Sequence, residues 1–277
     1  MAGRAPAGGL GCGDKGLTQL ATIEHGMGAY RFAGRDGVEL ACRERGSGRP
    51  LVLLHGFMGA GSHMLSSGRA GGFPEQGHRV IAPDFRGHGD SAKPHDPAAY
   101  PPDVLADDGL ALVEQLGLGD GDYDLGGYSL GGRIVVRMLV RGAKPGRAIV
   151  AGQGLAKVSG PQGGGVNHRV LTALADGAAI EPGSPDARIA HWISEFGADP
   201  VALLLVMNSL VPTPEDALRQ ITVPTLVAIG DKDERADADE LAALLPDSRF
   251  VRVPGDHGSA FAAPELTAAI AAFLAER

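Results

Sequence analysis

Residues 126–132, Gly-Gly-Tyr-Ser-Leu-Gly-Gly, decide the fold of this chain. They contain the pattern Gly-x-Ser-x-Gly, placed between an apolar run at 123–127 and a helical pattern at 130–140. In this setting a strand turns sharply into a helix, and only glycines, here Gly127 and Gly131, are small enough to flank the bend. The strained turn holds the hydroxyl of Ser129 above the sheet, where it can attack a carbonyl. The stretch therefore predicts a nucleophilic serine.

Short apolar runs alternate with helical patterns on both sides of this stretch. The runs are typical of strands buried in a parallel sheet, and their alternation with helices implies a mainly parallel sheet covered on both faces. A hairpin is expected before them, because Asp36-Gly37 suits a tight turn between 31–35 and 38–43. The sequence therefore predicts an α/β fold with a mostly parallel central sheet flanked by helices. The expected strands are 51–54, 79–82, 123–127, 147–151, 225–230 and 250–253, and the expected helices 102–116, 130–140, 237–245 and 264–275.

The alternation is lost between residues 152 and 221. This segment opens with a Gly- and Pro-rich stretch at 160–165 and then carries helical patterns around 168–175, 186–196 and 200–210. Because ligands of open α/β sheets bind at the carboxyl ends of the strands, we expect residues 152–221 to form an inserted helical cap or lid over that edge. The alternative is a structural excursion that covers apolar surface. Residues 26–151 and 222–277 then form the core, and residues 1–25 are expected to be a flexible leader.

Composition limits the partners of the chain. The net charge of -8 disfavours nucleic acid and anionic membranes. No apolar run is long enough to span a bilayer, and no secretory signal is apparent. Cys12 and Cys42 are too few for a disulfide framework, which favours a reducing cytoplasm. The nine histidines are scattered without metal-ligand spacing. We therefore expect a cytoplasmic monomer or homodimer that acts on a small molecule and binds no metal, nucleic acid or membrane.

Four further segments, two before and two after Ser129, contain short motifs built from Gly, Asp and His residues. They are 54–57 (Leu-His-Gly-Phe), 84–91 (Asp-Phe-Arg-Gly-His-Gly-Asp-Ser), 230–233 (Gly-Asp-Lys-Asp) and 255–258 (Gly-Asp-His-Gly). With them, the chain resembles the α/β-hydrolase-fold proteins from about Tyr30 to its end. In that family the nucleophile precedes the acid and the acid precedes the histidine. The resemblance implies the α/β-hydrolase fold and a catalytic triad.

The resemblance assigns the triad residues. A serine hydroxyl needs a base to accept its proton during attack, and His257 follows the last expected strand, where the family places its histidine. The family pattern Gly-x-x-Asp after strand 225–230 points to Asp233 as the carboxylate that orients the imidazole. Asp231 remains the alternative acid, whereas Asp256 is expected to be a solvated loop charge.

The same resemblance indicates an oxyanion hole and a pocket. Two backbone N–H groups are needed to stabilise the developing negative charge; Leu130, at the start of a helix, and Phe57 are expected to supply them. His55 and His88 are expected to be structural, as turn histidines that hydrogen-bond the backbone. Five apolar side chains are expected to line the substrate pocket: Met58, Tyr128, Leu155, Trp192 and Phe261.

The implied chemistry is acyl transfer. Ser129 attacks an ester carbonyl, His257 relays the proton to the leaving alcohol, and water releases the acid, with no metal or organic cofactor required. The expected activity is that of a carboxylesterase or lactonase acting on small, rather apolar substrates. A serine at this position excludes the members of the fold that attack through an aspartate, such as epoxide hydrolases and haloalkane dehalogenases.

Three alternatives stay open. The elbow sequence 127–133 is similar to that of a menaquinone-pathway lyase, SHCHC synthase, which eliminates pyruvate from an anionic substrate. Arg133 matches the elbow arginine of that enzyme, but the cap lacks the expected Glu-Arg pattern, and Arg169 and Arg188 would substitute only by chance. Carbon–carbon bond hydrolases and perhydrolases share the triad. A slow or non-catalytic ligand receptor is the alternative of another class, which repeated turnover would distinguish.

Overall fold

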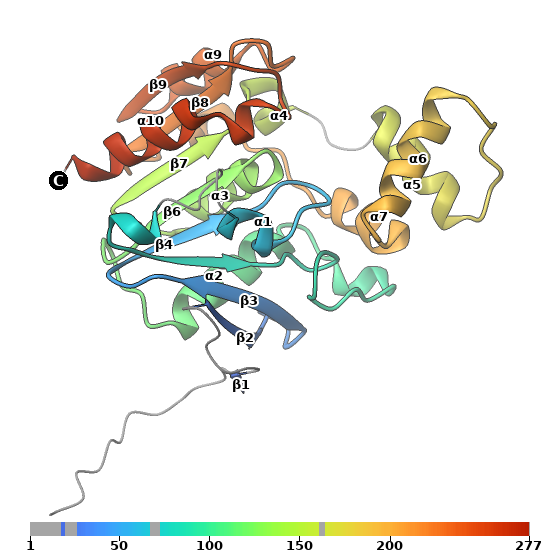
Figure 1. Cartoon of the computed structure of the whole chain (residues 1–277), viewed down its shortest axis with the longest axis horizontal. Helices are drawn as coiled ribbons and strands as arrows, with labels where there is room; N and C mark the ends of the chain where they lie inside the picture. The colour runs from blue at the N-terminus through green and yellow to red at the C-terminus, as the bar shows by residue number, and fades with distance from the viewer. Residues whose placement is uncertain (1–17, 20–26, 67–72, 161–163, 277) are drawn as a thin grey trace, which may run out of the picture.

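A nine-stranded sheet forms the centre of the protein (Figure 1). The computed structural model describes residues 18–19, 27–66, 73–160 and 164–276. The strand order is β1-β2-β3-β5-β4-β6-β7-β8-β9. Six neighbouring strands run parallel to one another: β5, β4, β6, β7, β8 and β9. Their bounds are β1 Thr18–Gln19, β2 Met27–Ala33, β3 Glu39–Arg45, β4 Arg49–Leu54, β5 His78–Pro83, β6 Asp124–Tyr128, β7 Arg147–Ala151, β8 Thr225–Gly230 and β9 Ser248–Val253. The mostly parallel sheet is confirmed.

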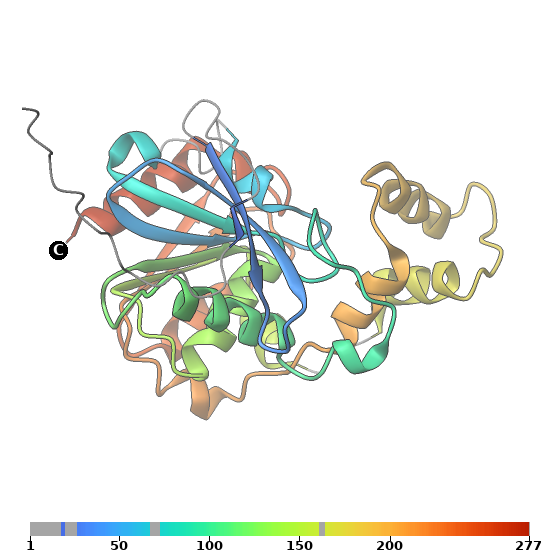
Figure 2. The same ribbon diagram turned by 90° about the horizontal axis from the view of Figure 1, so that it is seen from below.

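Helices cover both faces of this sheet, which explains why its central strands are buried throughout. Every residue of β6 and β8 is buried, as expected for strands packed on both sides. One core cluster packs under α2 (Val104–Gln115), α3 (Leu130–Val140) and α9 (Ala238–Leu244). The other packs under α1 (Gly61–Leu65) and α10 (Pro264–Ala275). Figure 2 shows α10 and α3 on opposite sides of the strands.

The segment between β7 and β8 has two kinds of helix. The short helices α4 (Leu155–Ser159) and α8 (Glu215–Leu218) pack on the core through the fully buried Val158 and Leu218. By contrast, α5 (Gly165–Ala175), α6 (Pro185–Glu195) and α7 (Pro200–Asn208) share a small apolar cluster of their own. These three helices lie beyond the carboxyl ends of the strands (Figures 1 and 2). They are consistent with a cap, within the expected residues 152–221.

Some expectations differ from the structure or fall outside it. Strand β2 spans Met27–Ala33 instead of the expected 31–35, and β9 begins at Ser248 instead of 250, because backbone pairing with β3 and β8 extends each strand beyond the expected residues. Apart from β1, the expected leader lies outside the described residues. No described helix alone is long and apolar enough to cross a membrane. Helices α6 and α7, bent by 104°, reach that length and composition only as a pair.

A fully buried ion pair fastens the loop after β5 to α2. The guanidinium of Arg86 contacts both carboxylate oxygens of Asp108, at 3.1 and 2.9 Å, and also Asp36 of the hairpin turn, at 2.6 Å. The side chain of Arg86 is completely buried and that of Asp108 nearly so. Such a pair is costly to break, because removing one partner leaves an uncompensated buried charge.

The first prediction concerns this pair. Arg86→Met should lower the free energy of unfolding by about 3–5 kcal/mol, because it leaves the buried carboxylate of Asp108 without its ion partner. The neighbouring Asp107 provides the control, because its bond to Arg141 is partly exposed to solvent and Asp107→Ala should cost about 0–1 kcal/mol. Urea denaturation followed by circular dichroism measures both values. Equal losses in the two variants would show that the buried pair does not hold this loop.

Candidate active site

Ser129 stands in a strained turn at the carboxyl end of β6. Its backbone angles are φ 56° and ψ -117°, a region that costs a non-glycine residue on the order of 1–3 kcal/mol. The turn is closed by backbone packing: a Cβ at Gly127 would collide with the carbonyl carbon of Gly131, and a Cβ at Gly131 with the carbonyl oxygen of Leu54. The glycines therefore allow α3 to approach the sheet closely enough to hold Ser129 in this conformation.

The structure brings the three predicted triad residues into one hydrogen-bonded chain. Nε2 of His257 lies 2.9 Å from Oγ of Ser129, and Nδ1 of His257 lies 2.7 Å from Oδ2 of Asp233. Because an ionised carboxylate only accepts, Nδ1 carries the proton and Nε2 is left to accept the serine proton. Each residue follows a different strand: β6, β8 and β9. The parallel sheet therefore gathers them at one edge.

Burial favours the neutral form of His257. It lowers the pKa of the ring below the usual value of 6.5, and the positive charge of Arg235 lowers it further, whereas the hydrogen bond that the ring donates to Asp233 raises it. For Asp233, burial alone would raise the pKa. The hydrogen bonds from His257 and from the Arg235 backbone outweigh burial, so that the pKa of this carboxyl falls below its usual value. At neutral pH the pair is thus an imidazole base held by a carboxylate.

The alternative acid has another partner. Oδ1 of Asp231 accepts a hydrogen bond from the backbone N–H of Gly255 at 2.8 Å. That bond ties the loop after β8 to the loop that carries His257. Oδ1 of Asp256 likewise accepts from the N–H groups of Gly258 and Ser259. Of the three aspartates, Asp233 is the one within hydrogen-bonding distance of the imidazole.

A tight turn after β4 carries Phe57, one of the two residues expected to supply an oxyanion-hole N–H group. The N–H of Gly59 donates to the carbonyl of Gly56 at 2.9 Å, and Met58 adopts φ 58° at the third position of this turn, as a type II turn requires. Within the described residues, the N–H groups of Phe57 and Leu130 have no hydrogen-bond partner. Leu130 also begins α3, whose N-terminus favours negative charge. Both N–H groups are available to a developing oxyanion.

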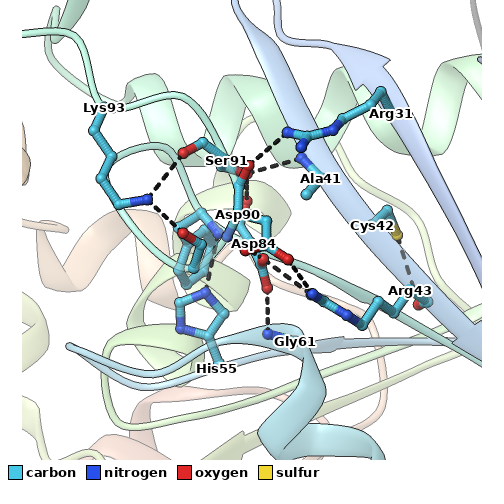
Figure 3. A network of polar contacts seen from close by, with 12 residues as sticks. Arg31, Ala41, Cys42, Arg43, His55, Gly61, Asp84, Asp90, Ser91 and Lys93 are labelled. Carbon is cyan, nitrogen blue, oxygen red and sulfur yellow. Dashed lines mark hydrogen bonds and ion pairs between the residues drawn. The ribbon is translucent and has the colours of Figure 1, made fainter. Parts of the chain in front are cut away.

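A buried network behind this turn fixes its position (Figure 3). The carboxylate of Asp84 accepts from the N–H of Gly61 at 2.6 Å, from the N–H of Asp90 at 2.7 Å and from Arg43 at 3.1 Å. The hydroxyl of Ser91 donates to the carbonyl of Asp84 and accepts from the N–H of Ala41. The loop after β5 is thereby bonded both to the hairpin and to the start of α1.

His55 and His88 are structural, as predicted. The N–H of Phe85 donates to Nε2 of His55 at 3.0 Å, so the proton of His55 is on Nδ1, 2.8 Å from the carbonyl of Gly56. Nδ1 of His88 lies 3.1 Å from the carbonyl of Arg86. Burial lowers the pKa of His55 to about 4 and that of His88 to about 3. Both rings therefore stay neutral and join loops rather than transfer protons.

A cavity of about 350 Å³ opens above Ser129 and His257. Of the five expected lining residues, Met58, Tyr128, Trp192 and Phe261 contribute to it. Leu155 does not, and its assignment was wrong: it starts α4 and packs on the core cluster. Sequence reasoning missed His63, Met64 and Phe196. Phe196 was recoverable, because it stands one helical turn after Trp192, and the two rings meet edge to face at 5.3 Å.

The chain is similar in sequence to known hydrolase-fold proteins. The model of the family described as "Alpha/beta hydrolase family" matches residues 51–270. The chain belongs to the alpha/beta hydrolase family. It is 30% identical over 257 residues to a non-heme haloperoxidase of Rhodococcus erythropolis, covering 80% of this chain and 90% of that protein.

Solved structures show the same fold. A thermophilic esterase from Thermogutta terrifontis superposes with a TM-score of 0.67 at 24% identity, covering 88% of this chain and 97% of that one. An enol-lactonase from Burkholderia xenovorans LB400 superposes with a TM-score of 0.68 at 22% identity, covering 89% of this chain and 100% of that one.

The described residues hold no group of three or more His, Cys, Asp or Glu side chains arranged to bind a metal ion.

The second prediction concerns the proton affinity of His257. Its pKa should lie below 6.5, and Arg235→Gln should raise it, because removing a nearby positive charge favours the imidazolium. Titration of the ring resonances by NMR measures both values without any substrate. Lys232→Gln removes an exposed cation from the same loop and is the control, expected to leave the pKa unchanged. A pKa that is equal in the wild type and Arg235→Gln would contradict the electrostatic account.

Proposed function

We propose that this protein is a serine hydrolase that cleaves carboxylic esters or lactones of small, rather apolar substrates through an acyl-enzyme on Ser129. The observation that carries the proposal is the hydrogen-bonded chain from Ser129 through His257 to Asp233 at the floor of a cavity. Two unpaired backbone N–H groups stand beside the same serine.

The proposed reaction has two halves. Oγ of Ser129 bonds to the carbonyl carbon while Nε2 of His257 takes its proton. The carbonyl oxygen becomes an oxyanion that accepts hydrogen bonds from the N–H groups of Phe57 and Leu130. When the intermediate collapses, the leaving alkoxide takes the proton from His257. Water then repeats the sequence on the acyl-enzyme and releases the acid, while Asp233 stabilises the transient imidazolium.

The cavity supports a small, apolar substrate. Its volume lies near the lower end of the range for ligand pockets, about 300–1,000 Å³. Side chains from the core and from α6 of the cap share its walls: Met58, Met64, Tyr128, Trp192, Phe196 and Phe261. The esterase and the enol-lactonase among the similar structures are compatible with ester or lactone cleavage.

A second candidate is perhydrolysis. The haloperoxidase relative, which matches over most of the chain, favours testing it. The same acyl-enzyme attacked by hydrogen peroxide in place of water would yield a peracid. Adding peroxide during ester turnover distinguishes the two: a perhydrolase diverts acyl groups to peracid, whereas a plain esterase releases only the carboxylic acid.

Hydrolysis of nitrophenyl esters with acyl chains from acetyl to octanoyl is the direct test. Repeated turnover with short and medium chains, absent in Ser129→Ala, supports the proposal. A folded protein that binds these esters but completes at most one turnover would instead be a receptor of this fold.

The third prediction separates the two aspartates. Asp233→Asn should reduce kcat by about 10⁴-fold, because the amide stabilises neither the required tautomer nor the imidazolium. Asp231→Asn keeps an oxygen that can accept from Gly255, and it should retain activity within about threefold. Steady-state kinetics with the best nitrophenyl ester gives both values. Loss of activity in Asp231→Asn with retention in Asp233→Asn would move the acid to Asp231.

A further inference from the structure

A second cavity, of about 180 Å³, shares the lining residue Phe57 with the cavity above Ser129. Phe57 and Leu130, whose N–H groups face the reacting carbonyl in the proposed mechanism, also line this cavity. In the described part of the chain no carboxylate lines it. Its remaining walls carry three cations and two amides beside two apolar side chains: Arg133, Lys157, Arg235, Gln153, Asn167, Met207 and Leu210.

Arg133 is buried in this wall and forms no ion pair with any described carboxylate, although the charge of Asp103 acts on it from nearby. It stands one turn after Ser129 on α3, about 6 Å along the helix axis, and is 4% exposed. Its terminal nitrogens donate to the carbonyls of Lys157 and Val211, while Nε has no partner within the described residues. Burial, and then the charge of Arg137, lower its pKa to about 10. A buried cation without a counter-ion is unfavourable unless a ligand supplies one.

The next arginine on the same helix shows the contrast. Arg137 binds both carboxylate oxygens of Asp103, at 2.7 and 2.5 Å. The two arginines are one turn apart and similarly buried. The protein thus neutralises the one that lies away from the oxyanion donors and leaves the one beside them unpaired.

Two neighbouring groups are also left open. Gln153, 4% exposed, donates through Nε2 to the carbonyl of Ser129, but its Oε1 has no partner within the described residues. Arg235 contacts Asp233 through Nη1 at 3.2 Å, and its buried Nε is likewise unpartnered there. Three of the residues that line this cavity thus each carry a buried polar atom without a partner among the described residues. Two of the three are guanidinium groups, whose charge favours an anionic ligand.

We infer that this cavity binds a carboxylate of the substrate, so that the preferred substrates are half-esters of short dicarboxylic acids. The inference rests on the proposed esterase function, because the ester carbonyl lies at Ser129 while the distal carboxylate pairs with Arg133, Lys157 and Arg235. The alcohol part then occupies the larger apolar cavity. A volume of 180 Å³ equals about six water molecules, which suits a carboxylate with a short chain. In a protein of net charge -8, a local cluster of cations also concentrates an anionic substrate.

The fourth prediction compares two esters that differ in charge alone. Monomethyl glutarate carries a carboxylate where methyl 4-nitrobutanoate carries a neutral nitro group of the same shape. The wild type should show a kcat/KM at least tenfold higher for the half-ester. Arg133→Met and Lys157→Gln should each reduce this preference, by about tenfold or more for Arg133, because charge-assisted hydrogen bonds are lost. Arg133→Lys, which restores the charge, should recover part of it.

The controls separate local from general charge effects. Arg169→Met removes an exposed cation from the cap and should leave the preference and both rates unchanged. If Arg133→Met does not fold, Lys157→Gln decides the question, because Lys157 is exposed at the rim. Equal kcat/KM values for the two esters in the wild type, or a preference that survives in Lys157→Gln and Arg133→Met, would overturn the inference.

Direct binding distinguishes failure of the subsite from failure of the proposed function. If neither ester is hydrolysed, the esterase function fails, and calorimetric titration with glutarate tests the cavity alone. Binding to the wild type that is lost in Lys157→Gln supports the carboxylate site. Absence of binding to the folded wild type overturns it.

Discussion

The conformation of one residue, Ser129, determines how the rest of the site is arranged. A positive φ at a non-glycine residue is maintained only where the surroundings leave no alternative. Here the N-terminus of α3 is pressed against the ends of β4 and β7, with glycines at 127, 131 and 132 making the approach possible. The same close packing places Ser129 at the carboxyl edge of the sheet, where α3 begins with Leu130, whose N–H group has no partner among the described residues.

The loops around this elbow are held by polar contacts as well as by apolar packing. Asp84 connects the loop after β5 to the start of α1, and His55 connects it to the turn that carries Phe57. The loop after β8 holds Asp233 and, through Asp231, the loop of His257. Buried polar networks of this kind fix geometry because an unmade bond inside the protein is costly. The serine, base and acid thus come from three strands but share one rigid frame.

Much of this was predictable from the sequence, because the decisive signals are local. The elbow glycines, the apolar runs of the parallel strands and the aspartate and histidine that follow two of them each occupy a few neighbouring residues. Helix α3 was predicted with its exact bounds. Short helices such as α4 and α8 have too few turns for a helical periodicity to show in the sequence. For the same reason the sequence does not show that Leu155 begins a helix packed on the core, and it was wrongly placed in the pocket.

The charged cavity was beyond sequence reasoning for a different reason. Its residues come from the turn after β4, α3, the loop after β7, α4, α5, α7 and the segment that follows it, and the loop after β8, and only tertiary packing brings them together. An arginine on a helix is usually solvated or ion-paired, and Arg137 is paired. The elbow resemblance singled out Arg133, but the sequence does not show that Arg137 is paired and Arg133 is not, since the pairing depends on where Asp103 lies in space. The apolar and the charged cavity share Phe57 as a lining residue.

The central claim is that Ser129 is a nucleophile activated by His257. Labelling with diisopropyl fluorophosphate, followed by peptide mass spectrometry, tests it without knowledge of the natural substrate. The account predicts one stoichiometric adduct, located on Ser129 and lost in a folded His257→Ala variant. An adduct on another residue, no adduct on the folded wild type, or equal labelling in His257→Ala would contradict it.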